Sequence, residues 1–240
     1  MQANAFKEIV QFRRSNRVFD ENTLVPDEVI ATALGHAQLS PNSSNMQLWE
    51  FYWIASAEKL AEIAPLCLNQ SAAKTAKHLV VFVTRRDFYK KRAKWNFEQV
   101  KKTVVGEPNK MQKNQLMYYS KLVPLVYAND PFGIITFVRR TISFFGGLAK
   151  PFFRLGGKAS IRIVTHKSCA LAAQTFMLGI AAEGFHSCPL EGFDELRLKR
   201  ALKLPRKAEI NMVVAVGKGT EKGIWGERNR VPAEEVVIKL

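Results

Sequence analysis

Apolar residues recur at helical spacing in several parts of the chain. The predicted helices cover about residues 4–14, 26–36, 88–104 and 167–183. In the first of them Phe6, Ile9 and Val10 fall on one helix face. The second begins at Pro26, which together with the acids that follow it makes a favourable first turn. The last is the clearest helix, and Gly184 supplies its end.

Shorter runs rich in apolar and β-branched residues predict strands. These runs lie at residues 51–54, 78–84 and 210–217. The run that ends in Thr84 is apolar throughout after His78, which is typical of a strand buried on both faces. Residues 40–45 are turn formers and predict a loop. Because helices and strands alternate irregularly, we expect an α+β fold with helices layered on a central sheet.

Length and composition narrow the class of protein. A chain of 240 residues can bury a sizeable core without disulfides or a structural metal. A hydrophobic content of 47% excludes wholesale disorder. Cys67, Cys169 and Cys188 lack the spacing of a disulfide scaffold or a zinc site. No secretory signal is visible and no apolar run is long enough to span a bilayer, so we expect a cytoplasmic location.

The formal net charge of +15 indicates an anionic partner, which could be nucleic acid, a membrane surface or a phosphorylated ligand. The charge is regional. Residues 85–113 carry ten basic and three acidic side chains, and residues 131–182 carry seven basic and no acidic ones. Each segment therefore contributes +7 and the rest of the chain only +1. The excess charge lies in the middle of the chain.

Short clusters of polar or flexible residues are candidates for binding chemistry. They lie at residues 13–19, 40–49, 184–193 and 228–232. The arginines and the serine of the first suit a phosphate dianion. In the third, Gly192 would let a backbone N–H approach a flat ligand, and in the fourth Arg228 and Arg230 project to the same side of an extended segment. Each cluster alone is also typical of a helix end or an ordinary turn.

The order and spacing of the clusters are more specific than any one of them. Arg-Arg-Ser-x-Arg-x-Phe is followed by Ser-Pro-x-Ser-x-Asn-x-Gln-x-Trp, then by an Ala-rich helix leading to Glu-Gly-Phe, and finally by Arg-x-Arg-x-Pro. This series resembles the nitroreductase family of FMN-dependent oxidoreductases over residues 4–84 and 165–235. The resemblance implies a single domain over residues 1–240, a three-layer α/β/α sandwich around a mainly antiparallel sheet, with a basic helical insertion at about 85–165.

The resemblance also implies a set of cofactor contacts. The FMN phosphate would be held by Arg13, Ser15, Arg17, Arg228 and Arg230, with Arg14 near the edge of the flavin ring. A loop from the other subunit would contact the ring and the ribityl chain through Pro41, Asn42, Ser43 and Asn45. Asn69 matches a flavin contact, whereas Ala72 stands where the family often has Lys. Lys74 would replace that lysine only with its side chain in a different direction.

The segment that would lie against the flavin consists of Pro189, Leu190, Glu191 and Gly192, with a backbone N–H near N5. Such a donor tunes the cofactor electrostatically, so the resemblance implies no catalytic side chain and no metal. His166 and His186 are accordingly interpreted as structural or surface histidines.

The implied assembly is an obligate homodimer with FMN at the interface and residues 234–240 wrapped onto the partner. NAD(P)H would reduce FMN, which would pass electrons to a nitroaromatic, quinone or enone in a ping-pong cycle. Two alternatives stay open. One is a non-catalytic flavin-fold module that binds an anionic membrane or nucleic acid, and the other is a flavoenzyme with a different reaction, such as dehalogenation.

The middle of the chain departs from the family pattern. Residues 131–157 hold six phenylalanines: Phe132, Phe137, Phe144, Phe145, Phe152 and Phe153. The favoured interpretation is a helix whose Phe face packs on the dimer core; the alternative is a helix that lies on an anionic membrane. Residues 85–94 interleave aromatic and basic residues as RNA-binding surfaces do. No nucleic-acid motif accompanies them, which favours a solvated helix face or a field that steers anionic substrates.

Overall fold

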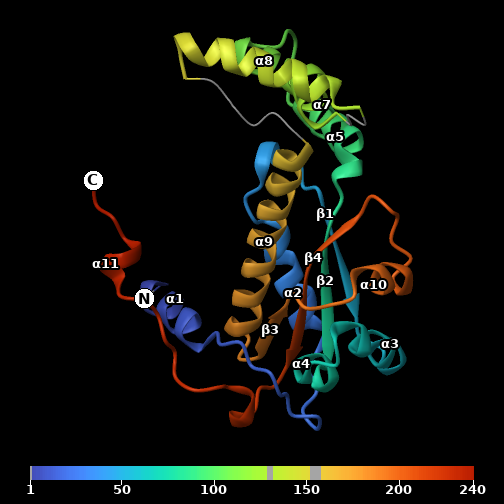
Figure 1. Cartoon of the computed structure of the whole chain (residues 1–240), viewed down its shortest axis with the longest axis vertical. Helices are drawn as coiled ribbons and strands as arrows, with labels where there is room; N and C mark the ends of the chain where they lie inside the picture. Colours follow the sequence, from blue (N-terminus) through green and yellow to red (C-terminus); the bar gives the residue numbers. More distant parts are fainter. Residues whose placement is uncertain (1, 129–131, 152–157) are drawn as a thin grey trace.

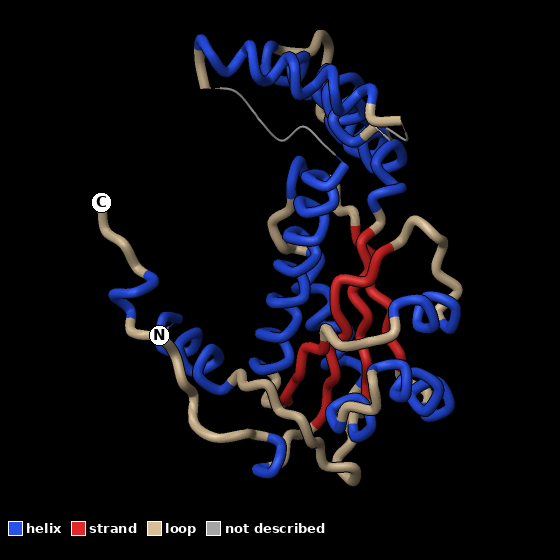
Figure 2. Tube along the Cα trace, in the orientation of Figure 1, coloured by secondary structure: helices blue, strands red, loops and turns tan. Residues whose placement is uncertain are grey.

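The computed structural model describes residues 2–128, 132–151 and 158–240. Its centre is an antiparallel sheet of four strands in the order β1-β2-β4-β3 (Figures 1 and 2). The strands are β1 (Trp49–Ile54), β2 (His78–Thr84), β3 (His186–Leu190) and β4 (Glu209–Gly217). The expected runs at 51–54, 78–84 and 210–217 are thus confirmed as strands, the first and last of them slightly longer than predicted.

The central strand β2 is buried on both faces, as its apolar run predicts. Alternate side chains point to opposite sides of a strand. Leu79, Val81 and Val83 therefore join one hydrophobic cluster, and Val80 and Phe82 join the cluster on the other face. The sheet separates two cores, each covered by helices, which confirms the expected three-layer arrangement.

Two helices cover one face of the sheet: α2 (Asp27–Gln38) and the long α9 (Lys158–Ala182) (Figure 1). They pack closely because small residues meet where they cross; a β-carbon on Gly179 would lie 3.1 Å from the β-carbon of Ala33. Gly184 has a φ of +74°, the left-handed conformation that ends a helix. Helix α9 begins nine residues before the predicted 167.

Three short helices cover the opposite face: α3 (Ala57–Ile63), α4 (Ser71–Thr75) and α10 (Glu195–Ala201) (Figure 1). The side chain of Ser56 accepts a hydrogen bond from the backbone N–H of Lys59 at 3.3 Å and caps α3. Asp194 caps α10 in the same way through Arg197, at 3.0 Å. These caps satisfy backbone donors that a helix start leaves unpaired.

The middle of the chain forms a helical tip at one end of the molecule (Figure 1). It contains α5 (Tyr89–Lys102), α6 (Lys110–Met117), α7 (Val123–Tyr127) and α8 (Ile134–Ala149), with a π-helical turn at Tyr118–Leu122. Helix α5 confirms the basic helix expected over 88–104. Phe152 and Phe153 lie outside the described residues.

The two ends of the chain lie beside each other, away from the sheet (Figure 1). They carry α1 (Gln2–Phe12) and α11 (Ala233–Val236). Helix α1 ends two residues before the predicted Arg14, and α2 runs to Gln38 rather than fading near Gly35. Within the described ranges, no helix has both the length and the apolar character needed to cross a membrane.

One expectation about secondary structure was wrong. The segment from Gly184 to Phe193 was interpreted as a helix end or a turn, yet residues 186–190 form strand β3, antiparallel to β4. Pro189 masked this strand in the sequence, because proline cannot donate a hydrogen bond to a sheet ladder. Strand β3 tolerates it because β3 lies at the edge of the sheet.

Candidate functional site

The Arg-rich segment that follows α1 runs along the outer side of the edge strand β3. Ser15 forms a parallel bridge with Ser187, and the backbone N–H of Asn16 donates to the carbonyl of Ser187 at 3.2 Å. The neighbouring Arg17 N–H donates to the carbonyl of Gly223 at 2.8 Å. This pairing holds the first predicted cluster against β3, which lies within the third cluster.

Asn16 locks this segment in place. Its Nδ2 donates to the carbonyl of Thr220 at 2.8 Å, and its Oδ1 accepts from the N–H of Val18 at 3.1 Å. The side chain is almost fully buried, at 1% relative exposure. Gly219 and Gly223 line its socket so closely that a β-carbon on either would overlap the Asn16 amide. Asn16 is not among the predicted site residues, although it lies within the basic motif of residues 13–17.

Four arginines from opposite ends of the chain meet beside this segment. They are Arg13, Arg14, Arg228 and Arg230, and they are called the arginine cluster below. Burial, and then the positive charges of Arg228, Arg230 and Arg14, lower the pKa of the Arg13 guanidinium. The Arg13 side chain makes no hydrogen bond or ion pair with the residues that the structure describes. The cluster is therefore a concentration of positive charge that favours an anion.

Arg228 has a structural task within the cluster. Its guanidinium donates to the carbonyls of Val10, Gln11 and Arg13, with donor–acceptor distances of 3.3, 2.8 and 2.9 Å. Helix α1 has no basic residue in its own last turn, so Arg228 supplies the positive charge that the C-terminal end of a helix favours. Arg14 Nη2 similarly donates to the carbonyl of Gly226 at 2.9 Å. Both contacts join the C-terminal segment to α1.

Gly192 lies just beyond β3, and Gln70 holds it there. The Gln70 amide donates to the carbonyls of Gly192 at 2.7 Å and of Cys67 at 3.1 Å. A β-carbon on Gly192 would lie 3.3 Å from Gln70 Nε2, so a larger residue would require the Gln70 amide to shift by a few tenths of an ångström. Among the described residues the Gly192 N–H has no hydrogen-bond acceptor. Gln70 was missed by the sequence reasoning, because its neighbour Asn69 carries the family match.

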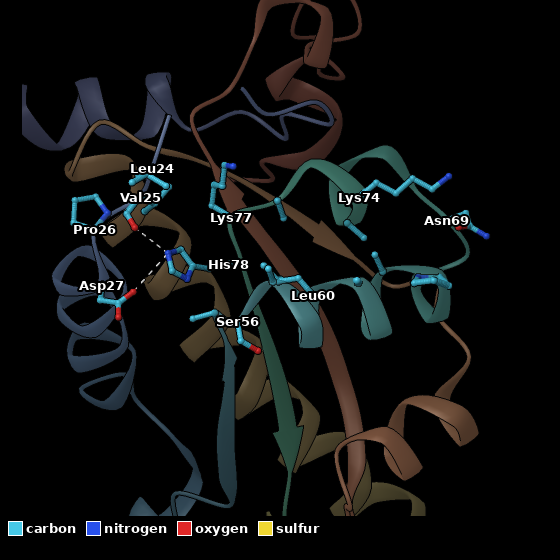
Figure 3. A pocket seen from close by; sticks show the side chains of 17 residues that line it. Leu24, Val25, Pro26, Asp27, Ser56, Leu60, Asn69, Lys74, Lys77 and His78 are labelled. Carbon is cyan, nitrogen blue, oxygen red and sulfur yellow. Dashed lines mark hydrogen bonds and ion pairs between the residues drawn. The ribbon is translucent and has the colours of Figure 1, made fainter. Parts of the chain in front are cut away.

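The position of Ala72 explains one departure from the family pattern. Ala72 is 2% exposed and belongs to the core under α4, where a lysine side chain would have to be buried. Lys74 is exposed and does not take over this place. Instead Lys74 and Asn69 both line a cleft of about 1030 Å³ between the start of α2 and α3 (Figure 3).

His78 lines the same cleft, and its hydrogen bonds show that it is structural. Its Nε2 contacts the carbonyl of Val25 at 2.9 Å (Figure 3). Its Nδ1 accepts from Trp53 Nε1–H at 3.1 Å. This pattern requires the proton on Nε2, since a carbonyl can only accept. The Asp27 carboxylate oxygen Oδ1 lies 3.9 Å from His78 Nε2.

Two further histidines, His186 and His166, are also engaged. His186 Nδ1 accepts from the N–H of Gly219 at 3.1 Å, and its ring lies 4.6 Å from that of Phe12. Burial, and next the charge of Lys218, lower the pKa of His186 and favour the neutral ring that this bond needs. His166 contacts Glu209 at 2.9 Å at the far end of the sheet.

The second predicted cluster lies at the other end of the molecule, between α2 and the helical tip (Figure 1). Its loop is held by hydrogen bonds: Asn42 Oδ1 accepts from the N–H of Gln47 at 2.8 Å, and Asn96 Nδ2 donates to the carbonyl of Asn45 at 2.9 Å. The Ser43 N–H donates to Ser168 Oγ at 3.3 Å. Within one chain Pro41–Asn45 therefore does not meet the arginine cluster.

Arg17 and the residues of β3 complete the predicted set. The Arg17 guanidinium stacks over the ring of Trp225, 4.3 Å from its centroid, and Arg230 donates to the carbonyl of Asn229 at 2.6 Å. Pro189 and Leu190 pair with Val214 and Val213 of β4. One chain thus brings together the residues around Arg13, β3 and Arg228, with Gln70 holding Gly192 at the end of β3.

This architecture is that of an α+β protein with a cluster of arginines beside the edge of its sheet. The model of the nitroreductase family matches residues 10–218, and the chain belongs to that family. The chain is 28% identical to the protein DrgA of Synechocystis over 228 residues, which cover 95% of this chain and 90% of DrgA.

Solved structures share the fold. A protein of Staphylococcus epidermidis, described as an NAD(P)H:FMN oxidoreductase, has a TM-score of 0.75 and 20% identity, covering 98% of this chain and 95% of its own. A protein of Exiguobacterium sibiricum, described as a nitroreductase and solved in complex with FMN, has a TM-score of 0.67 and 22% identity, covering 98% and 97%.

Proposed function

We propose that this protein is an FMN-dependent NAD(P)H oxidoreductase that reduces nitroaromatic, quinone or enone-type small molecules. The observation that carries the proposal is the arginine cluster beside β3, in a chain of the nitroreductase family. When bound, FMN supplies the chemistry of hydride transfer between a nicotinamide and an electron acceptor. The two substrates would occupy one pocket in turn, in a ping-pong cycle.

The residues present fit a phosphate dianion. The positive charges of Arg14, Arg228 and Arg230 act on Arg13, whose guanidinium has no partner among the described residues and can donate a forked pair of hydrogen bonds. Ser15 would add a hydroxyl. Arg228 is committed to the end of α1, so we assign it mainly electrostatic attraction and the positioning of its segment. Arg17, whose guanidinium stacks on Trp225, would likewise contribute mainly electrostatic attraction.

Gly192 fits the edge of a flat ring. Its N–H lacks an acceptor among the described residues, and its carbonyl is held by Gln70 at 2.7 Å. A donor fixed in this way can bind a ring nitrogen without reorganising. Pro189, Leu190 and Glu191 would form the wall beside it, and Asn69 would approach from the loop before α4.

We further propose a homodimer in which the partner completes the site. Pro41, Asn42, Ser43 and Asn45 lie far from the arginine cluster of their own chain (Figure 1), so they can reach such a ligand only from a second copy. The C-terminal segment supports this proposal, because it exposes a series of apolar side chains: Trp225, Val231, Val236, Val237, Ile238 and Leu240. The buried free thiols of the three cysteines support a reducing, cytoplasmic location.

The decisive experiment measures FMN binding by the cofactor-free protein. Replacing Arg13 with Gln should raise the Kd for FMN by at least about tenfold, because a charge-assisted hydrogen bond contributes about 1.5–3 kcal/mol. The same change at the exposed Arg197 is the matched control and should leave the Kd unchanged. A protein that neither binds FMN nor oxidises NADH or NADPH in its presence would refute the proposed function. Unchanged affinity in the Arg13 variant alone would refute only the phosphate assignment.

A further inference from the structure

Helix α8 turns its apolar side chains away from the protein. The exposed set, called the α8 apolar face here, consists of Ile134, Phe137, Val138, Ile142, Phe144, Phe145 and Leu148. Phe137, Phe145 and Leu148 are 71%, 64% and 70% exposed. On a soluble globular chain such a contiguous apolar surface indicates an interaction site rather than ordinary surface composition.

The opposite side of α8, which packs on the protein, is small and polar. Ser143 is buried, and Gly146 and Gly147 are half-buried. The guanidinium of Arg139 donates to the carbonyl of Leu125 in α7. The helix is therefore amphipathic in the reverse sense to a core helix, whose apolar stripe faces inward. Because the polar side of α8 is the one that packs on the protein, the Phe side chains on the opposite side are exposed.

The charges around α8 are of one sign. No acidic residue occurs between residues 131 and 182, which carry seven basic ones. Arg140 is exposed on the flank of the apolar face, and the exposed Lys150 follows the helix end. Helix α8 lies at the extreme end of the molecule, within the helical tip that also holds the basic α5 (Figure 1). A broad surface can therefore approach it without meeting the sheet.

We propose that the α8 apolar face docks the protein on an anionic lipid bilayer, with the helix lying in the plane of the interface. A bilayer accepts the phenylalanines at the acyl boundary, while its headgroups neutralise Arg140 and Lys150. Two copies of this chain joined through their α8 apolar faces are the poorer occupant, because such a pair would bring two basic regions together with no acid between residues 131 and 182 to offset them. With its 16 residues the helix lies on the membrane rather than crossing it.

The test is co-sedimentation of the full-length, FMN-loaded protein with vesicles. We expect binding to phosphatidylcholine vesicles that contain phosphatidylglycerol, and weaker binding to phosphatidylcholine alone or at raised ionic strength. The double variant Phe137→Glu, Phe145→Glu should lose affinity for the anionic vesicles by about tenfold or more, since both side chains would enter the bilayer. Arg140→Gln should reduce the preference for anionic vesicles while leaving the residual binding to neutral ones unchanged.

The matched control places the same charge on two leucines that are equally exposed elsewhere. Leu39→Glu, Leu196→Glu should bind vesicles as the wild type does. Circular dichroism and the melting temperature show whether each variant is folded. Equal binding to neutral and anionic vesicles, or no binding by the wild type, overturns the proposal. If the α8 double variant instead changes the oligomeric state while vesicle binding is absent, the occupant of this face is a second copy of the chain.

Discussion

The socket of Asn16 allows a sharp test of what holds the arginine segment on the sheet edge. Replacing Gly223 with Ala would place a β-carbon within the Asn16 amide and 2.7 Å from the backbone nitrogen of Val18. Asn16 cannot keep both its hydrogen bonds, to the Thr220 carbonyl and from Val18 N–H, once it moves aside. A buried polar group that loses its partner costs about 1–3 kcal/mol. We therefore expect the variant to lose about 2–4 kcal/mol of unfolding free energy.

The assay is urea unfolding of the cofactor-free protein, so that ligand binding does not enter the measured stability. Gly35→Ala is the matched control. Gly35 lies within α2, and a β-carbon there meets nothing within 4 Å, so this change should stabilise the protein by about 0.5–1 kcal/mol. A Gly223→Ala protein within about 0.5 kcal/mol of the wild type would refute the reasoning.

A double-mutant cycle isolates the contact between the two residues. Asn16→Ala alone should also destabilise the protein, because the Thr220 carbonyl and the Val18 N–H both lose their partner. Adding Gly223→Ala to that background should cost less than in the wild type, since the amide it would overlap is gone and only the 2.7 Å approach to the Val18 nitrogen remains. Strictly additive costs would show that Gly223 acts through something other than Asn16.

Three further predictions follow from other contacts. Burial and Lys218 lower the pKa of His186 below its unfolded value, so the stability it contributes is present above about pH 6.5 and is lost as the pH falls through the folded pKa; His186→Gln should flatten this dependence in urea titrations between about pH 5 and 8. Phe176→Ala empties a fully buried core position and should cost about 3–5 kcal/mol. Gln70→Ala frees the Gly192 carbonyl and should raise the Kd for FMN about fivefold.

Each of these has an outcome that contradicts it. A pH slope identical in the wild type and the His186 variant would show that another group is responsible. A cost below about 1 kcal/mol for Phe176→Ala would mean that the layer between α9 and the sheet collapses around the gap. For Gln70→Ala, unchanged FMN affinity together with unchanged stability would remove the amide from the positioning of Gly192.

Much of the layered fold is readable in the sequence because its signals are local. The apolar run at residues 78–84 predicts β2 to the residue, and its alternation divides the two cores. Strand β3 was not predicted, because Pro189 disfavours strand structure locally. The proline is tolerated because β3 lies at the edge of the sheet. The early start of α9 has a similar cause: Ile161 packs in the cluster that holds Val123 and Tyr127, a contact that local propensity does not register.

The candidate site likewise has some features that can be read from the sequence and others that depend on tertiary contacts. The arginines at residues 13–17 and 228–230, and the basic excess in the middle of the chain, are evident without a structure. The packing of the whole chain was needed to show that Arg228 donates to the carbonyls at the end of α1, and that Arg13 lies among three other arginines with no ion pair to any described residue. It also decided that α8 faces outward with its phenylalanines. Helical and strand periods act over a few residues, whereas contacts between the two ends of a chain depend on how all the layers pack together.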